Sequence, residues 1–156
     1  MSLPEGAEEL VLKTKYFGSI EIEESDVLTF QKGLFAFEDE KKFVLLPFEG
    51  SDSALLCLQS AADEHLAFVV MNPFAVCPQY APVLQAGELE KLGVADSTDL
   101  CYYVMCVVRD PVADSTLNLK CPVVINDQTR QAMQVILEGG DYHMRHRLEE
   151  FGGAPC

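Results

Sequence analysis

The sequence predicts a mainly β protein, a small antiparallel, barrel-like domain with one short helix. Short apolar segments rich in β-branched and aromatic residues recur at intervals of about 10 residues, as in sandwiches and barrels. Turn-forming residues separate these segments, and only one interval has the apolar spacing of a helix. Hydrophobic residues make up 49% of the 156 residues, enough for one core. We therefore expect one domain at residues 10–150, with frayed termini at residues 1–9 and 151–156.

The first two expected strands form a hairpin. Residues 10–17 are rich in β-branched and aromatic side chains, and residues 20–23 alternate apolar and acidic side chains. Gly18 and Ser19 separate the two segments, which predicts a two-residue turn in which Gly18 has a positive φ.

Eight further segments are expected to be strands because each is apolar and is bounded by turn formers. They cover residues 27–30, 43–46, 54–59, 66–71, 100–108, 117–121, 123–126 and 131–137. The one expected helix covers residues 86–92. Leu84, Leu89 and Leu92 give it a partial apolar stripe, and Gly93 is suited to its C-cap.

The chain is strongly acidic. Its 11 Lys and Arg residues against 25 Asp and Glu residues give a formal net charge of −14. Phosphate backbones and anionic lipid surfaces repel such a chain, so direct nucleic-acid binding and membrane association are not expected, and a basic partner is favoured. The longest apolar run, residues 100–108, is far shorter than the roughly 18 residues that span a bilayer. With no signal-peptide pattern at the N-terminus, a cytoplasmic location is expected.

Acidic residues dominate one stretch of the chain. Between Lys42 and Lys91 there is no Lys or Arg. The acidic residues within this stretch are Glu49, Asp52, Asp63, Glu64, Glu88 and Glu90. Two interpretations remain open: solvated loops between buried strands, or an electronegative face that meets a positively charged protein.

Enzymatic or metal chemistry would have to use the cysteines and histidines. His143 and His146 have the i, i+3 spacing that places two imidazoles on one face of a helix, although Arg145 beside them would repel a cation. A Cys57–His65 pair has no catalytic signature around it. A small barrel enzyme or metal-binding protein that uses Cys and His is therefore the alternative hypothesis, and no cofactor is expected.

Apolar residues also follow turns, where exposed side chains are normally polar. Residues 33–38, 71–74 and 77–80 combine Gly, Asn or Pro with large apolar side chains. Such groups either close the ends of a barrel or form a hydrophobic groove for a partner helix.

Several of these segments, in this order, resemble the flagellar assembly factor FliW family. The resemblance extends from about Leu12 to Arg147. Its blocks are residues 14–22 (TKYFGSIEI), 29–39 (TFQKGLFAFED), 43–46 (FVLL), 58–60 (LQS), 66–74 (LAFVVMNPF), 122–126 (PVVIN) and 145–146 (RH). The family pattern has Pro and Gly where this chain has Phe35 and Ala36, so the loop after Gly33 is expected to differ in shape.

The resemblance implies a small, largely β, barrel-like cytoplasmic protein without enzymatic activity. Members of the family bind flagellin in the cytosol. They also bind CsrA, a small RNA-binding protein that represses flagellin translation. The two partners are mutually exclusive, so export of flagellin frees the factor to bind CsrA and relieve the repression.

Seven positions within or near the matching blocks are expected to contact a partner: Leu34, Phe37, Gln59, Asn72, Pro73, Phe74 and Tyr80. Gln59 would supply a directional hydrogen bond, the aromatic residues would be anchors, and the Asn72-Pro73 pair would hold its loop. The alternative for each residue is a structural role, since motif positions in a small barrel are often turns or core.

Overall fold

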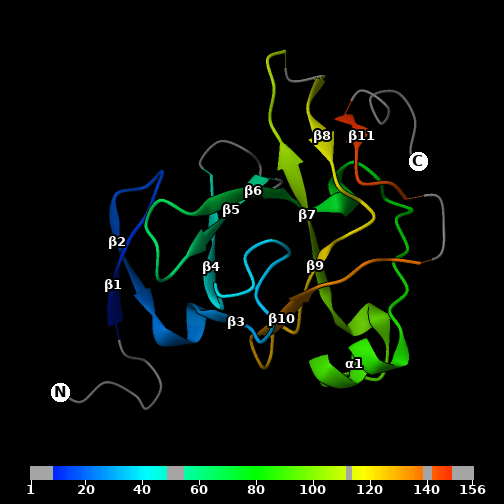
Figure 1. Ribbon diagram of the computed structural model, residues 1–156, viewed down its shortest axis with the longest axis horizontal. Coiled ribbons are helices and arrows are strands. Elements are labelled where there is room, and N and C mark those ends of the chain that lie inside the picture. The colour runs from blue at the N-terminus through cyan, green and yellow to red at the C-terminus, as the bar shows by residue number, and fades with distance from the viewer. Residues whose placement is uncertain (1–8, 49–54, 112–113, 139–141, 149–156) are drawn as a thin grey trace.

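Seven strands close into a barrel (Figure 1). The computed structural model describes residues 9–48, 55–111, 114–138 and 142–148. Around the barrel the strands are β3 (Leu28–Phe30), β4 (Lys42–Pro47), β5 (Leu55–Ser60), β6 (Ala67–Met71), β7 (Cys101–Val107), β9 (Val123–Ile125) and β10 (Gln131–Gln134). Because β9 pairs with both β7 and β10, and β10 pairs with β3, the ring is complete. The mainly β, barrel-like class is confirmed.

One pair of neighbours in the barrel is parallel. Gln131 and Ala132 of β10 pair with Thr29 and Phe30 of β3 in the same direction. A closed ring with an odd number of strands cannot alternate in direction all the way round, so at least one neighbouring pair must be parallel. The expected antiparallel pairing therefore holds for every neighbouring pair of the ring except this one, which joins segments from the two ends of the chain.

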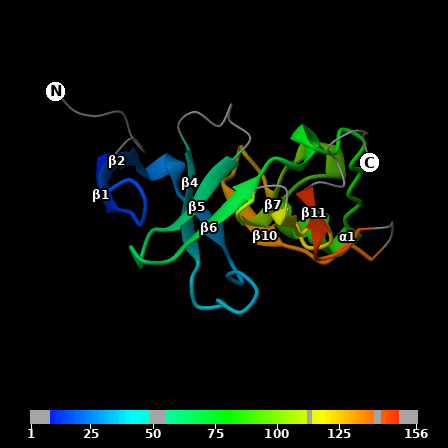
Figure 2. The same ribbon diagram turned by 90° about the horizontal axis from the view of Figure 1, so that it is seen from above.

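The N-terminal hairpin stands beside the barrel as a separate two-stranded sheet (Figures 1 and 2). It consists of β1 (Glu9–Lys13) and β2 (Ser19–Glu23). Its connection is five residues long, not two, because Thr14 both donates its N–H and hydroxyl to the carbonyl of Gly18 and accepts from the N–H of Phe17. Gly18 has a φ of +67°, as predicted.

The ends of the chain differ most from the expected elements. Of the residues expected to be frayed, 1–8 and 151–156 lie outside the described residues, and Glu9 belongs to β1. The expected strand at residues 117–121 shortens to β8 (Thr116–Leu117), which pairs with β7 and with an unexpected strand, β11 (His146–Arg147). A two-residue strand has no alternation from which it can be predicted.

The one α-helix, α1, covers Ala86–Leu92, as predicted. It starts with a capping box in which Glu88 accepts a hydrogen bond from the N–H of Gln85. It ends at Gly93, whose φ of +75° makes the expected left-handed C-cap. The buried Asn126 amide donates to the carbonyl of Leu92 at 2.7 Å, which ties the helix end to β9. Short 3₁₀ turns occur at η1 (Glu24–Asp26), η2 (Pro73–Ala75) and η3 (Ser97–Asp99).

Alternate residues of the barrel strands face two different cores. Inside the barrel, Phe30, Phe43 and Leu58 pack with residues from the other strands, including the partly buried Tyr103 and Met105 of β7. The intervening β7 residues Tyr102 and Val104 face outward, where the segment containing η2 and α1 covers them. A third, smaller cluster joins the hairpin to β4 through Leu12, Ile22 and Val44. Both faces of β7 are therefore covered.

Replacing Gly33 with alanine should destabilise the fold much more than replacing Gly18. Both residues have a left-handed φ, which costs an alanine about 1–2 kcal/mol. At Gly33 the added Cβ would also lie 2.5 Å from the carbonyl oxygens of Phe37 and Glu38, whereas at Gly18 it would meet nothing within 4 Å. Urea denaturation should show a loss for Gly33→Ala that exceeds the Gly18→Ala loss by about 1–3 kcal/mol. Equal losses would show that the loop relaxes around the extra carbon.

Candidate partner-binding surface

The β3–β4 connection forms a tight loop that presents two phenylalanines. Leu34 and Phe37 exchange backbone hydrogen bonds in both directions, at 3.3 and 2.8 Å. Leu34 is buried beneath the loop, whereas Phe35 and Phe37 are 45% and 39% exposed. Ala36 has a φ of +69°, a conformation that favours glycine. Ala36, which stands where the family pattern has Gly, is therefore in a strained conformation.

An apolar groove lies between this loop and the strands β6 and β7. Its volume is about 350 Å³. The residues that line this apolar groove are Leu34, Phe35, Phe68, Val69, Met105, Cys106, Val107, Asn118, Cys121, Gln134 and Met144. Phe35, Val107 and Met144 are about half exposed, so a large part of the apolar lining is open to solvent. Open apolar surface of this kind is typical of a protein-interaction site.

Hydrogen bonds and ring contacts hold the groove in shape. The Gln134 side chain accepts from the N–H of Phe35 at 3.1 Å and donates to the carbonyl of Cys121 at 3.2 Å. It thereby ties the loop to the other side of the groove. The Phe37 ring packs edge-on against Phe68, with 5.3 Å between the ring centroids. The groove is therefore preformed, which lowers the entropic cost of binding.

An aromatic cluster of Phe74, Tyr80 and Tyr102 lies where β6 leaves the barrel. The side chain of Asn72 accepts from the N–H of Phe74 at 3.0 Å and so begins η2, with Pro73 buried in its first position. Phe74 is 40% exposed and packs on Tyr80 and Tyr102, with centroid distances of 5.8 and 6.3 Å. Asn72 and Pro73 thus fix the turn that presents Phe74.

The tyrosines of this aromatic cluster are structural. The Tyr80 ring contacts Tyr142 edge-on at 4.7 Å, and its hydroxyl donates to the carbonyl of Leu119 at 2.7 Å. Burial raises the pKa of Tyr80 far above its ordinary value and that of Tyr102 to about 12. Both hydroxyls therefore stay protonated as hydrogen-bond donors at physiological pH.

Gln59 is fully buried near the end of β5, next to the turn to β6. Its carboxamide oxygen accepts from the N–H of Lys15 at 2.9 Å. Its nitrogen lies 3.1–3.3 Å from the carbonyl oxygens of Ser60, Asp63, Glu64 and Leu66. All of these partners belong to the chain itself, so the directional hydrogen bonds expected of Gln59 are used to join the turn to the hairpin.

The seven expected contact residues lie in three places. Leu34 and Phe37 belong to the β3–β4 loop beside the apolar groove, and Gln59 lies near the end of β5. Asn72, Pro73, Phe74 and Tyr80 form or support the aromatic cluster. Of the seven, Phe37 and Phe74 are the exposed ones, so these two are the residues most suited to direct contact. Contact with a partner stays a prediction for the set.

Several residues that line the groove were not predicted from the sequence to contact a partner. Phe68, Met105 and Val107 sit in ordinary strand segments, where alternation does not tell which face is covered. Phe35 lay within a recognised block, and its apolar side chain next to a turn was the available signal.

The acidic residues of the stretch between Lys42 and Lys91 do not form one face. Asp63 and Glu64 lie in the β5–β6 turn near the hairpin, and Glu88 and Glu90 lie on α1. These two segments are at opposite ends of the molecule (Figures 1 and 2). Glu49 and Asp52 lie outside the described residues. The hypothesis of a single electronegative face fails for the described residues because neighbours in sequence are separated by the barrel.

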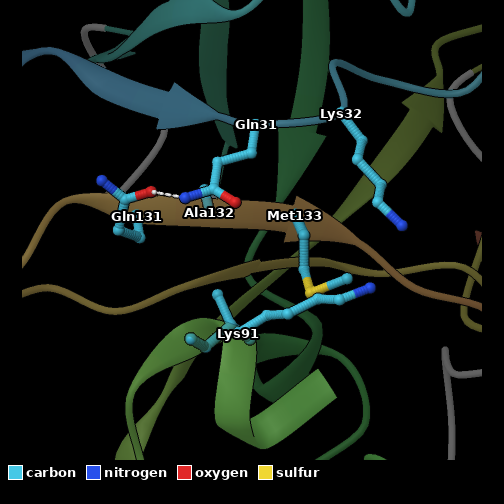
Figure 3. A pocket seen from close by; sticks show the side chains of 7 residues that line it. Gln31, Lys32, Lys91, Gln131, Ala132 and Met133 are labelled. Carbon is cyan, nitrogen blue, oxygen red and sulfur yellow. Dashed lines mark hydrogen bonds between the residues drawn. The ribbon is translucent and has the colours of Figure 1, made fainter. Parts of the chain in front are cut away.

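A local positive patch lies where α1 approaches β10. The side chains of Lys32 and Lys91 come from opposite sides and converge beside Met133 (Figure 3). Contact with the Lys91 ammonium and repulsion from its charge lower the pKa of Lys32. The cavity between these side chains has a volume of only about 30 Å³, roughly enough for a water molecule or two and too small for a partner's side chain.

The alternative hypothesis of Cys and His chemistry has no support. In the described parts of the chain, no group of three or more His, Cys, Asp or Glu side chains is placed to hold a metal ion. His143 and His146 are not on a helix; the N–H of His143 donates to the ring of His146, which belongs to β11. Burial raises the pKa of the Cys57 thiol to about 11, which opposes formation of a nucleophilic thiolate.

Known proteins match almost the whole chain. The family model described as FliW protein matches residues 11–148. The chain belongs to the FliW family. The flagellar assembly factor FliW of Geobacillus kaustophilus (strain HTA426) is 42% identical over 88% of this chain and 94% of the relative. That of Thermotoga neapolitana is 38% identical over 90% of this chain and 94% of the relative.

The structural comparison agrees with the sequence comparison. A crystal structure of the flagellar assembly factor FliW matches with a TM-score of 0.82 and 40% identity, covering 88% of this chain and 96% of that chain. The FliW resemblance seen in the sequence is thus confirmed for both sequence and fold. No helix among the described residues combines the length and the apolar content needed to cross a membrane.

Replacing Gln59 with leucine should destabilise the protein by about 1–3 kcal/mol, because the N–H of Lys15 and the carbonyls of the β5–β6 turn would lose their buried partner. Gln128→Leu is the matched control, since Gln128 is exposed. Thermal and urea unfolding of the two variants measure the difference. Unchanged stability combined with weaker partner binding would instead assign Gln59 a contact role.

Proposed function

We propose that this chain is a non-enzymatic regulator that binds flagellin in the cytosol. When it is free of flagellin, it binds the RNA-binding translational regulator CsrA and relieves repression of flagellin synthesis. Each partner then lowers the concentration of the protein available to the other, so flagellin synthesis follows flagellin export.

Membership of the FliW family is the observation that carries this proposal. The relatives from Geobacillus and Thermotoga are named flagellar assembly factors, and the chain covers 94% of the length of each. A function in flagellar assembly needs a surface that recognises a flagellar component. The apolar groove supports such a role because it is open, apolar and held in place by Gln134.

The chemistry of the groove suits a helical segment of flagellin. An amphipathic helix buries one apolar face by inserting side chains spaced three or four residues apart. The exposed ring of Phe35 lines the groove, and the exposed Val107 and Met144 are among its other lining residues. These side chains are large and partly exposed, as anchoring residues of an interface are.

The charge of the chain supports CsrA as the second partner. A protein that binds RNA presents basic surface to the phosphates. A net charge of −14 attracts such a surface and speeds its encounter with the chain, while it keeps the chain itself away from RNA.

Competition between the two partners tests the proposal. The purified protein should bind flagellin and CsrA from the same genome in separate titrations by isothermal calorimetry. Excess flagellin should then suppress CsrA binding, and on size-exclusion chromatography no complex containing all three proteins should appear. Absence of binding to both partners would refute the proposal, and a stable complex of all three would refute mutual exclusion.

Phe74→Ala should weaken partner binding by about 1–3 kcal/mol with little loss of stability, as expected for an exposed interface anchor. Val83→Ala is the control, because Val83 is an apolar residue that is 77% exposed. Calorimetric titration and thermal unfolding measure the two effects. If Phe74→Ala melts far lower and binds normally when folded, Phe74 acts through its contacts with Tyr80 and Tyr102 alone.

A further inference from the structure

The outer edge of β1 has main-chain groups that point away from its partner strand. β1 pairs with β2, and the bond from the N–H of Thr14 to the carbonyl of Gly18 sets which residues exchange hydrogen bonds in this antiparallel ladder. Because hydrogen-bonded pairs alternate with non-hydrogen-bonded ones, Leu12 and Leu10 bond to β2. The N–H and C=O groups of Val11 and Lys13 therefore point outward.

Gln59 shows that this alternation continues past the end of the strand. Lys15 is the next residue in the outward-pointing series, and its N–H donates to the buried side chain of Gln59 at 2.9 Å. No hydrogen bond from any described residue reaches the main-chain groups of Val11 or Lys13. The N–H of Lys15 is thus satisfied within the chain, and the main-chain groups of Lys13 and Val11 have no partner among the described residues.

A groove runs along this unpaired edge. Its volume is about 630 Å³, and its lining residues are Val11, Leu12, Lys13, Ala61, Ala62, Asp63, Glu64 and His65. The β5–β6 turn lies beside the hairpin in both views (Figures 1 and 2). Val11, at the middle of the edge, is 74% exposed. An exposed strand edge with an apolar residue is a ready template for another strand.

The chemistry of this groove suits an extended segment with basic side chains. A helix uses its own main-chain groups internally, so only an extended chain can satisfy those of Val11 and Lys13. Among the charged lining residues, Asp63 and Glu64 outnumber Lys13, and the neighbouring β2 contributes Glu21 and Glu23. We propose that an extended segment of a basic protein partner adds to the outer edge of β1 as a third strand. This proposal rests on the proposed function, which supplies CsrA as the basic partner.

A pair of proline variants tests the proposal. Val11→Pro removes an outward N–H and leaves the β1–β2 hydrogen bonds intact, which an edge strand tolerates. Glu21→Pro is the matched control. Glu21 lies opposite Val11, so its N–H points outward from the other edge of the same hairpin. Both variants should remain folded by circular dichroism and thermal unfolding.

CsrA affinity should fall roughly tenfold or more in Val11→Pro and stay within about twofold in Glu21→Pro, since added strands bind through main-chain hydrogen bonds. If the wild-type chain binds CsrA and both prolines leave the affinity unchanged, the added strand is refuted and the proposed function stands. If the Val11→Pro variant no longer binds flagellin but still binds CsrA, the added strand does not come from CsrA, and the proposal is wrong about its partner. If the wild-type chain binds neither protein, the proposed function itself fails.

Amide hydrogen exchange on the unmodified protein gives a second readout that does not depend on a variant folding. In the free protein, the amides of Val11 and Lys13 should exchange quickly, while that of Leu12, bonded to β2, exchanges slowly. Addition of CsrA should slow exchange at Val11 and Lys13 by at least roughly tenfold, as main-chain pairing requires. Unchanged exchange at both residues in a saturated complex would overturn the proposal.

Discussion

Closure of the barrel is the constraint on which the rest of the structure depends. The three residues of β9 are fully buried and pair on both sides, with β7 and with β10. Closure leaves the seven barrel strands without an edge along the ring, and it requires the parallel pairing of β3 with β10 because the number of strands is odd. Among the described strands, an open edge therefore belongs to elements outside the ring, such as the N-terminal hairpin.

Because the sheet closes into a barrel, alternate residues of one strand face the interior and the outside. Tyr103 and Met105 of β7 contribute to the interior, while Tyr102 and Val104 are covered by the segment that contains η2 and α1. Beside the β3–β4 loop, apolar side chains of β6 and β7 line the groove. The groove and the hairpin edge differ in chemistry: the first offers apolar side chains to a helix, and the second offers main-chain groups to a strand. A whole protein bound at either site would cover more than its anchoring contacts, so separate anchors are compatible with mutual exclusion.

Local features were predictable from the sequence to the extent that their causes are local. The bounds of α1 and its cap at Gly93 follow from side-chain spacing and from the backbone freedom of glycine. The positive φ of Gly18 was likewise predicted, whereas the five-residue turn that ends at Gly18 depends on a hydroxyl bond of Thr14 that the residue types do not reveal. Of the candidate site, Phe37 and Phe74 were expected to be anchors, and both aromatic side chains are exposed in the structure. Gln59 shows the limit of this reasoning, because a polar residue in a motif suits a buried clamp as well as a contact.

Composition, alternation and family blocks in the sequence were sufficient to predict the mainly β class, the positions of most strands along the chain, the acidity and membership of the FliW family. These properties depend on which residues are present and on their near neighbours along the chain. The pairing of β3 with β10, the separation of Asp63 and Glu64 from the acidic residues of α1, and the assembly of the groove were decided by the tertiary structure. Each of these depends on which distant segments meet when the ring closes. The residue pattern of a single strand does not indicate which other strands it will pair with.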